Sequence, residues 1–192
     1  MNELEDLVDA LSAVVSGFQR LGIRHYVGGS VASSFHGAIR STMDVDLVCE
    51  LAEGHIAQLI ESIGTDHYAS ETAVRDAVRR KGCFNLIHLP TSFKVDVFIS
   101  RGRPFDLEAM DRASIQRIGE TRFVELRIAT AEDSIISKLE WYRLSNETSE
   151  RQWDDVSKLL DLHEEVIDRD YLCRAAQSVG VEDLLNRLLE DR

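Results

Sequence analysis

Hydrophobic residues recur at steps of three and four near the start of the chain, which is the spacing of one face of an α-helix. This spacing predicts an amphipathic helix over residues 3–20, and Gly22 is well placed to end it. The residues that define the apolar face are Leu4, Leu7, Val8, Leu11, Val14, Val15 and Phe18.

The pattern then changes to short continuous apolar runs, which favour buried strands. The first run, IRHYV at 23–27, ends at a pair of glycines, and the second is DVDLVC at 44–49. The small residues SVASSFHG at 30–37 predict a short helix between these two strands.

Further strands and helices alternate up to about residue 129. Helical spacing covers 53–63 and 71–80, and FNLIHL and FKVDVFIS predict an antiparallel hairpin across the turn at 89–92. A helix is expected after the basic loop at 101–104, followed by a strand at 122–130 (RFVELRIAT).

From Thr130 onward the pattern is helical only. Thr130 with Asp133, and Ser149 with Gln152, resemble the capping boxes that begin helices. Trp141 and Tyr142 could stack a nucleobase, but they lie at helical spacing with Leu139 and Leu144, so we expect both in the core. The sequence therefore predicts an α/β (α+β) fold, in which residues 1–129 form a mixed sheet flanked by helices and residues 130–192 form a C-terminal helical bundle.

Composition and charge narrow the classes of partner. The chain of 192 residues has 22 basic and 34 acidic residues and a formal net charge of −12. Binding to duplex DNA through its phosphates requires a basic surface, so we expect no duplex DNA partner. No apolar run approaches the roughly 20 residues that a membrane span requires. Three scattered cysteines and an acidic N-terminus favour a reduced, cytoplasmic protein without a membrane partner.

Three aspartates lie inside apolar strands. Asp44 and Asp46 are two residues apart, so they should share one face of their strand, opposite Val45 and Leu47, and Asp96 lies within a later strand. Buried carboxylates repel one another and are costly to desolvate. A divalent metal removes both costs, and carboxylates with open positions for phosphate suit Mg²⁺. The alternative is an exposed strand end, because acidic pairs at this spacing are common in so acidic a chain.

The turn formed by Gly28, Gly29 and Ser30 connects the first strand to the small-residue helix. Glycine permits close approach of a ligand, and free N–H groups and the Ser30 hydroxyl can donate to phosphate. The alternative is an ordinary strand-to-helix turn. The sequence matches neither a Walker loop nor a dinucleotide-binding fingerprint.

Together these residues resemble the nucleotidyltransferase superfamily with the DNA polymerase β-type catalytic core. Its signature is a strand ending in Gly-Gly or Gly-Ser, then Asp-x-Asp on the next strand and a third carboxylate on a later one. Thirteen residues separate Ser30 from Asp44. The spacer, with Arg40 and Thr42 before the acidic pair, is similar to small bacterial members of the abortive-infection and toxin–antitoxin type.

The helical tail resembles the same group. Its segments at 130–138 and 151–156 are similar to a helix whose lysine contacts nucleotide phosphate and a later Arg…Asp helix that closes the pocket. Lys138 matches the lysine, and Asp155 or Asp154 matches the aspartate. The resemblance implies catalytic and metal-binding roles for Asp44, Asp46 and Asp96. It also implies nucleotide binding by Gly28, Gly29, Ser30, Arg40, Thr42, Lys138 and Asp155, with Arg101 and Arg103 as weaker candidates.

The implied activity is a Mg²⁺-dependent transfer, with Mn²⁺ as a substitute, of a nucleoside monophosphate from a nucleoside triphosphate to an acceptor hydroxyl. The acceptor is a small molecule, a tRNA end or a protein side chain. One alternative is a non-catalytic module of the same fold that binds a protein partner such as an antitoxin, and another is a metal-dependent phosphohydrolase. The basic cluster Arg75, Arg79, Arg80 and Lys81 is either a solvated helix face or a grip on a phosphate-bearing acceptor.

Overall fold

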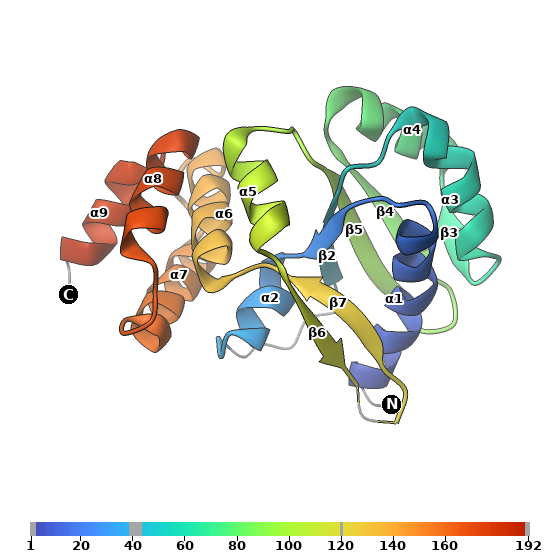
Figure 1. Ribbon diagram of the computed structural model, residues 1–192, viewed down its shortest axis with the longest axis horizontal. Coiled ribbons are helices and arrows are strands. Elements are labelled where there is room, and N and C mark those ends of the chain that lie inside the picture. The colour runs from blue at the N-terminus through green and yellow to red at the C-terminus, as the bar shows by residue number, and fades with distance from the viewer. Residues whose placement is uncertain (1–2, 39–43, 120, 191–192) are drawn as a thin grey trace.

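A computed structural model describes residues 3–38, 44–119 and 121–190. Within these ranges the core is one mixed sheet with helices on both sides and a further group of helices at one end (Figure 1). The sheet has seven strands in the order β3-β4-β5-β2-β1-β7-β6. The predicted α/β class with C-terminal helices is therefore confirmed. No helix of the described residues is long and apolar enough to cross a membrane.

The strands pair both parallel and antiparallel. β2 is parallel to β5 and antiparallel to β1, and β1 is parallel to β7. β4 is antiparallel to both β3 and β5, so the predicted hairpin is confirmed. The strands are β1 (His25–Val27), β2 (Asp44–Cys49), β3 (His67–Ala69), β4 (Cys83–His88), β5 (Phe93–Ile99), β6 (Ser114–Ile118) and β7 (Val124–Ile128).

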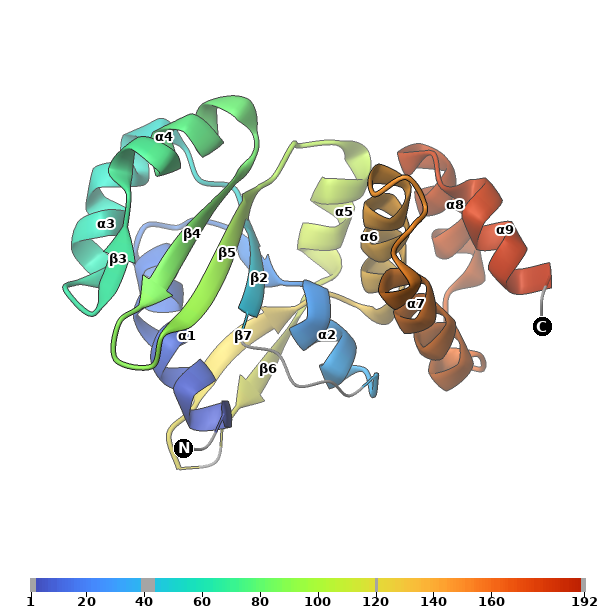
Figure 2. The same cartoon turned by 180° about the vertical axis from the view of Figure 1, so that it is seen from behind.

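Helices α1, α3 and α4 pack on one face of the sheet. In Figure 2 α1 lies behind β4 and β5, and α3 and α4 lie near the edge of the sheet that β3 forms. The helices of the sheet region are α1 (Glu3–Arg20), α2 (Gly29–Phe35), α3 (Ile56–Ile63), which follows the 3₁₀ turn η1 (Glu53–His55), α4 (Glu71–Arg80) and α5 (Pro104–Arg112). The C-terminal helices are α6 (Ala131–Leu144), α7 (Glu150–His163), α8 (Arg169–Val179) and α9 (Glu182–Glu190).

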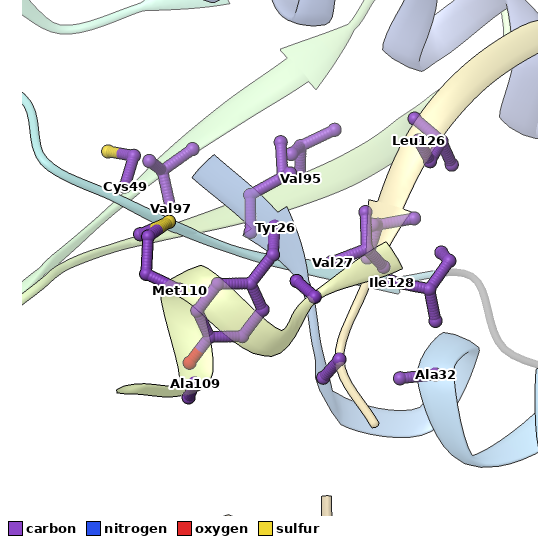
Figure 3. Close-up of a cluster of buried hydrophobic side chains, with 14 of the residues drawn as sticks. Tyr26, Val27, Ala32, Cys49, Val95, Val97, Ala109, Met110, Leu126 and Ile128 are labelled. Carbon is purple, nitrogen blue, oxygen red and sulfur yellow. The ribbon is translucent and has the colours of Figure 1, made fainter. Parts of the chain in front are cut away.

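The hydrophobic core explains why these strands and helices form where they do. Alternate residues of β2 and β5, such as Val45 and Val95, are fully buried, while the residues between them are not. Figure 3 shows that β1 contributes Tyr26 and Val27 to a cluster that also draws on β5, α5 and β7. The core thus fixes one face of the central strands and leaves the other face free for polar side chains.

A buried polar cluster lies where the C-terminal helices meet the sheet region. Asp133, at the start of α6, is 1% exposed. It accepts a hydrogen bond from the Thr130 hydroxyl at 2.9 Å and another from the Tyr171 hydroxyl of α8. The Arg112 guanidinium of α5 lies 3.7 Å from the Asp133 carboxylate and 3.8 Å from the centre of the Tyr171 ring. Three separate helices are therefore tied together at one carboxylate.

The helix starts match the sequence expectations in part. Thr130 caps α6, because its hydroxyl accepts the Asp133 N–H at 3.1 Å. Ser149 is the N-cap of α7 but makes no side-chain capping bond, so the second predicted capping box is wrong. The Gln152 side chain is instead directed to Lys138, with the amide oxygen 3.4 Å from the ammonium nitrogen.

Candidate active site

The three predicted aspartates lie on the open face of the central strands. In the parallel pairing of β2 with β5, Asp46 lies directly opposite Asp96 and Asp44 lies opposite Lys94. Val45 and Leu47 are buried on the other face, as expected from the period of a strand. The register therefore brings together two carboxylates that are 50 positions apart in the sequence.

The glycine turn lies against Asp46. The Gly28 N–H donates to the Asp46 carbonyl oxygen at 2.9 Å. Gly29 has a φ of +56°, and a Cβ atom built there would lie 1.6 Å from Asp46 Oδ2. Position 29 therefore requires glycine both for its backbone conformation and for the space that the aspartate occupies. At Gly28 the nearest atom to such a Cβ is a Tyr26 ring carbon at 3.7 Å, an ordinary contact.

The Asp46 carboxylate lies in an unfavourable electrostatic environment. Burial raises its pKa above the ordinary carboxyl range, and the carboxylates of Asp96 and Asp44 raise it further. The positive charge of Lys138 and a hydrogen bond from the Ser30 N–H act in the opposite direction but are outweighed. A buried carboxylate that faces another carboxylate attracts a cation.

Asp96 is engaged by two neighbours on the same face. Asn85 of β4, opposite Asp96 in the antiparallel pairing, donates from its side-chain amide to Asp96 Oδ1. The Lys94 ammonium nitrogen lies 2.9 Å from Asp96 Oδ2 and 4.0 Å from Asp44 Oδ2. The hydrogen bond to Asp96 raises the pKa of Lys94.

The donor set fits a hard divalent cation. Asp44, Asp46 and Asp96 offer carboxylate oxygens from one face of two adjacent strands, which are the ligands that Mg²⁺ prefers. Burial and the carboxylates of Asp96 and Asp44 raise the pKa of Asp46, so a cation bound beside it would favour its charged form. Among the described residues, no three His, Cys, Asp or Glu side chains are arranged to hold a metal ion as they stand. Lys94 and Asn85 engage the two oxygens of Asp96.

Lys138 and Asp155 form a buried ion pair between α6 and α7. The Lys138 ammonium nitrogen lies 2.8 Å from Asp155 Oδ2, and the two side chains are 5% and 11% exposed. Lys138 also lines the cavity described below, whereas Asp155 does not. Asp155 therefore holds the lysine in place, and its neighbour Asp154 is exposed.

The Ser30 hydroxyl is joined to the C-terminal helices. Arg151 of α7 donates to Ser30 Oγ at 3.0 Å, across 121 positions of sequence. Ser30 itself is buried, and its N–H bonds to the Asp46 carboxylate. The other two predicted phosphate-binding residues, Arg40 and Thr42, lie outside the described residues.

A cavity of about 410 Å³ opens between the sheet and α6. Four of the predicted site residues, Gly28, Gly29, Asp46 and Lys138, line it together with Gln152, whereas Ser30, Asp44 and Asp96 are not among its lining residues. The wall of the cavity also includes Val48, Lys81, Cys83, Phe98, Arg101, Arg103, Glu140 and Trp141.

The cations of this wall differ in their pairing. Arg101 and Arg103 both bond to Glu140, at 3.1 and 2.7 Å, and Arg103 also bonds to Asp106. Lys81 has no ion-pair partner among the described residues. The other members of the basic cluster pair with acidic residues of the same region: Arg75 with Glu71 and Glu53, and Arg79 and Arg80 with Asp76.

Trp141 is not a core residue, in contrast to the sequence prediction. It is 49% exposed, and its ring meets Phe98 edge to face with centroids 5.8 Å apart. The neighbouring Tyr142 is buried, as predicted. The periodicity of α6 could not separate these positions, because Trp141 lines an open cavity between the helix and the sheet, which local spacing does not reveal.

Sequence reasoning missed Asn85 and Lys94 as site residues, and it placed Arg151 in the pocket-closing helix without giving it a role of its own. Lys94 and Asp96 share a face by the two-residue period, so that signal was present in the sequence. The positions of Asn85 and Arg151 depend on strand pairing across β4 and β5 and on the packing of α7 beside α2, and neither follows from local pattern.

Comparison with solved structures relates this fold to known proteins. The chain is similar to an antigenic nucleotidyltransferase-like protein from Paracoccidioides brasiliensis, with 18% identity, 99% of this chain and 93% of that chain covered, and a TM-score of 0.54. It is also similar to the antibiotic-resistance factor ANT(2'')-Ia, with 14% identity, 95% and 92% covered, and a TM-score of 0.51. No protein-family model and no curated protein matches the sequence. The chain therefore has a nucleotidyltransferase-like fold.

Proposed function

We propose that the protein is a nucleotidyltransferase that moves a nucleoside monophosphate from a nucleoside triphosphate to an acceptor hydroxyl. The observation that carries the proposal is the placement of Asp46 directly opposite Asp96, on an open face, with Gly29 against the Asp46 carboxylate. Two facing carboxylates beside a glycine turn suit the binding of a metal–triphosphate complex. They fit this role better than that of a non-catalytic partner-binding module or of a phosphohydrolase. The nucleotidyltransferase-like fold agrees with this assignment.

Asp44, Asp46 and Asp96 would hold Mg²⁺, or Mn²⁺ in its place. When bound, the cation neutralises phosphate charge and lowers the pKa of a coordinated hydroxyl. In the transfer, the acceptor oxygen forms a bond to the α-phosphorus, the bond to the bridging oxygen breaks, and pyrophosphate leaves. Asp96 would accept the hydroxyl proton once Lys94, whose ammonium nitrogen is 2.9 Å away, has left its Oδ2 atom.

Two lysines on the cavity wall supply positive charge toward the triphosphate. Lys138 is held by Asp155 and already acts on Asp46 through space, and Lys81 has no ion-pair partner among the described residues. Charged oxygens of a triphosphate need such compensation in a partly buried cavity.

The nucleobase would rest against Trp141. A half-exposed tryptophan braced by Phe98 presents a flat apolar surface in the same cavity as Gly29 and Lys138. Stacking of a base on an aromatic ring contributes about 1–3 kcal/mol. In a Trp153→Phe background Trp141 is the remaining tryptophan, so we expect its fluorescence to be quenched by the triphosphate. Trp141→Ala should weaken nucleotide binding about 10-fold or more, and unchanged affinity would contradict the stacking role.

The test of the proposed function is thermal unfolding with ATP, GTP, CTP or UTP, each with and without Mg²⁺. At a ligand concentration of about 100 Kd, binding adds about 2.7 kcal/mol to the free energy of unfolding. For a chain of this size that is a rise of about 5–10 °C in the melting temperature. We expect one or more triphosphates to stabilise the wild type with Mg²⁺ but not Asp44→Asn/Asp46→Asn. Asp66→Asn, which makes the same change at an exposed site, is the matched control.

A response that is absent from the wild type for all four triphosphates would overturn the proposal. A partner-binding module of the same fold would then be the better account, and unchanged capture of that partner by the double variant would support it. Product released from nucleotide without any acceptor would instead indicate a phosphohydrolase.

Transfer itself is tested with the stabilising triphosphate labelled at its α-phosphate. Small hydroxylated molecules, tRNA and protein are the three classes of acceptor to offer. Label that moves to one class in the wild type, and not in the double variant, identifies the acceptor.

A further inference from the structure

Lys94 lies among the three carboxylates of the site. It precedes Asp96 by two residues on β5 and lies opposite Asp44 of β2, so the pairing of the strands places its side chain on the carboxylate face. The ammonium nitrogen is 2.9 Å from Asp96 Oδ2 and 4.0 Å from Asp44 Oδ2. A positive charge of the protein itself therefore stands between two groups proposed to hold the metal.

Asn85 completes the arrangement on the other side of Asp96. Its amide donates to Oδ1 while Lys94 binds Oδ2, so both oxygens of this carboxylate are engaged by side chains. Asp96 is 16% exposed and Lys94 is 41% exposed. The lysine thus reaches in from solvent on a flexible stem and is free to leave, whereas the carboxylate is fixed in the sheet.

We propose that Lys94 is a built-in counter-ion of the carboxylate site. Its ammonium group offsets part of the negative charge of Asp96 and Asp44 when no divalent cation is bound, and it must leave Asp96 before one can bind there. This inference rests on the proposed function, since it concerns the same carboxylates. Lys94 therefore competes with the metal and lowers the affinity of the nucleotide-free site for it.

The charge balance of the site gives the direction of the effect. Three carboxylates and one ammonium group carry a net charge of −2, and removal of the ammonium charge leaves −3. Displacement of the lysine costs the Lys94–Asp96 hydrogen bond and places a cation beside another cation, so the free metal binds less tightly than three carboxylates alone would allow.

The test measures binding of Mn²⁺ alone to the nucleotide-free protein, by the loss of the free-ion paramagnetic resonance signal and by calorimetry. Lys94→Met removes the charge and keeps the length of the side chain, and Lys94→Gln is the second variant if the first folds poorly. We expect Mn²⁺ to bind to either variant about fivefold more tightly than to the wild type, or more.

Two further variants isolate the charge at this position. Lys94→Arg keeps it and should bind Mn²⁺ like the wild type. Lys158→Met removes a charge from an exposed position on α7 and should also leave the affinity unchanged. Adding Asp96→Asn to Lys94→Met should abolish the increase in Mn²⁺ affinity, because the Asp96 carboxylate released by Lys94 is the additional metal ligand.

Mn²⁺ affinity in Lys94→Met and Lys94→Gln equal to or below that of the wild type would overturn the inference. If Mg²⁺-dependent stabilisation by a triphosphate were still present in the wild type, the proposed function would survive that result. Absence of Mn²⁺ binding from the wild type and both variants, together with absence of any triphosphate response, would overturn the two proposals at once.

Discussion

Asp46 and Asp133 are both carboxylates whose pKa is raised above its ordinary range chiefly by burial, yet the protein treats them differently. Asp133 receives hydrogen bonds from the Thr130 and Tyr171 hydroxyls and lies beside the Arg112 guanidinium. Among the described residues, Asp46 receives the Ser30 N–H and faces a second carboxylate, Asp96. The difference lies in the partners that each carboxylate has.

The contrast distinguishes a structural carboxylate, Asp133, from Asp46, which we propose binds a cation. The groups around Asp133 come from α5, from α8 and from Thr130 at the start of α6, so this carboxylate joins three parts of the fold. At Asp46 the neighbouring carboxylates leave negative charge that the protein compensates only in part, through Lys138. A cation with its phosphate ligand would balance the charge at Asp46, whereas the charge of Asp133 is already compensated by its protein partners.

The largest effect on stability is expected from Asp133→Ala. It leaves the buried Tyr171 hydroxyl without its acceptor and removes one of the two carboxylates beside the Arg112 guanidinium, which keeps its bond to Glu132, at a cost of about 3 kcal/mol. Urea unfolding at neutral pH measures the change in the free energy of unfolding. A loss below about 1 kcal/mol would show that the cluster is not a structural joint.

The glycine turn gives the next largest effect. Gly29→Ala must adopt a φ of +56° and displace the Asp46 side chain, whose Oδ2 atom lies 1.6 Å from the new Cβ position. We expect a loss of about 2 kcal/mol together with loss of the triphosphate response. Gly28→Ala, where the nearest atom is at 3.7 Å, is the matched control and should change stability by less than about 0.5 kcal/mol. Equal effects at the two positions would contradict the tight contact with Asp46.

Asp46→Asn should act in the opposite direction from Asp133→Ala. Removing a charge that burial and Asp96 both disfavour should leave stability unchanged or raise it, by up to about 1 kcal/mol. The same variant should lose its Mg²⁺-dependent response to triphosphate. Clear destabilisation, measured by the same urea titration, would mean that Asp46 is a structural carboxylate like Asp133.

The smallest expected effect is in the pH dependence of stability. A carboxyl group whose pKa is raised on folding binds protons more readily in the folded state, so its contribution to stability is lost as pH rises. For Asp46 the loss begins near the ordinary value of 3.8 and is complete above the raised pKa. The stability of Asp46→Asn relative to the wild type should therefore grow over that interval and then level off. A difference that is constant with pH would contradict the raised pKa.

The sequence predicted the parts of this site that depend on local pattern. The two-residue period placed Asp44 and Asp46 on one face, and the glycine pair after an apolar run marked the turn. Strand β6 was missed because Ile115 and Ile118 do not alternate, and β3 because three residues at a sheet edge carry little pattern.

Local pattern could not give the register between paired strands of the sheet. The contact of Asp46 with Gly29 and the pairing of Asp96 with Asn85 both depend on which residues of neighbouring strands face each other. The exposure of Trp141 likewise depends on the cavity between the sheet and α6, and helical spacing alone does not reveal which side of a helix faces a cavity.

The most direct test compares the Mg²⁺–triphosphate-induced rise in melting temperature in the wild type, Asp46→Asn and Asp133→Asn. The account predicts that Asp133→Asn melts at a lower temperature without ligand but keeps the full rise, while Asp46→Asn keeps its melting temperature and loses the rise. If the ligand-induced rise in melting temperature were retained in Asp46→Asn, or lost equally in both variants, the claim that Asp46 binds the metal–triphosphate complex would be contradicted.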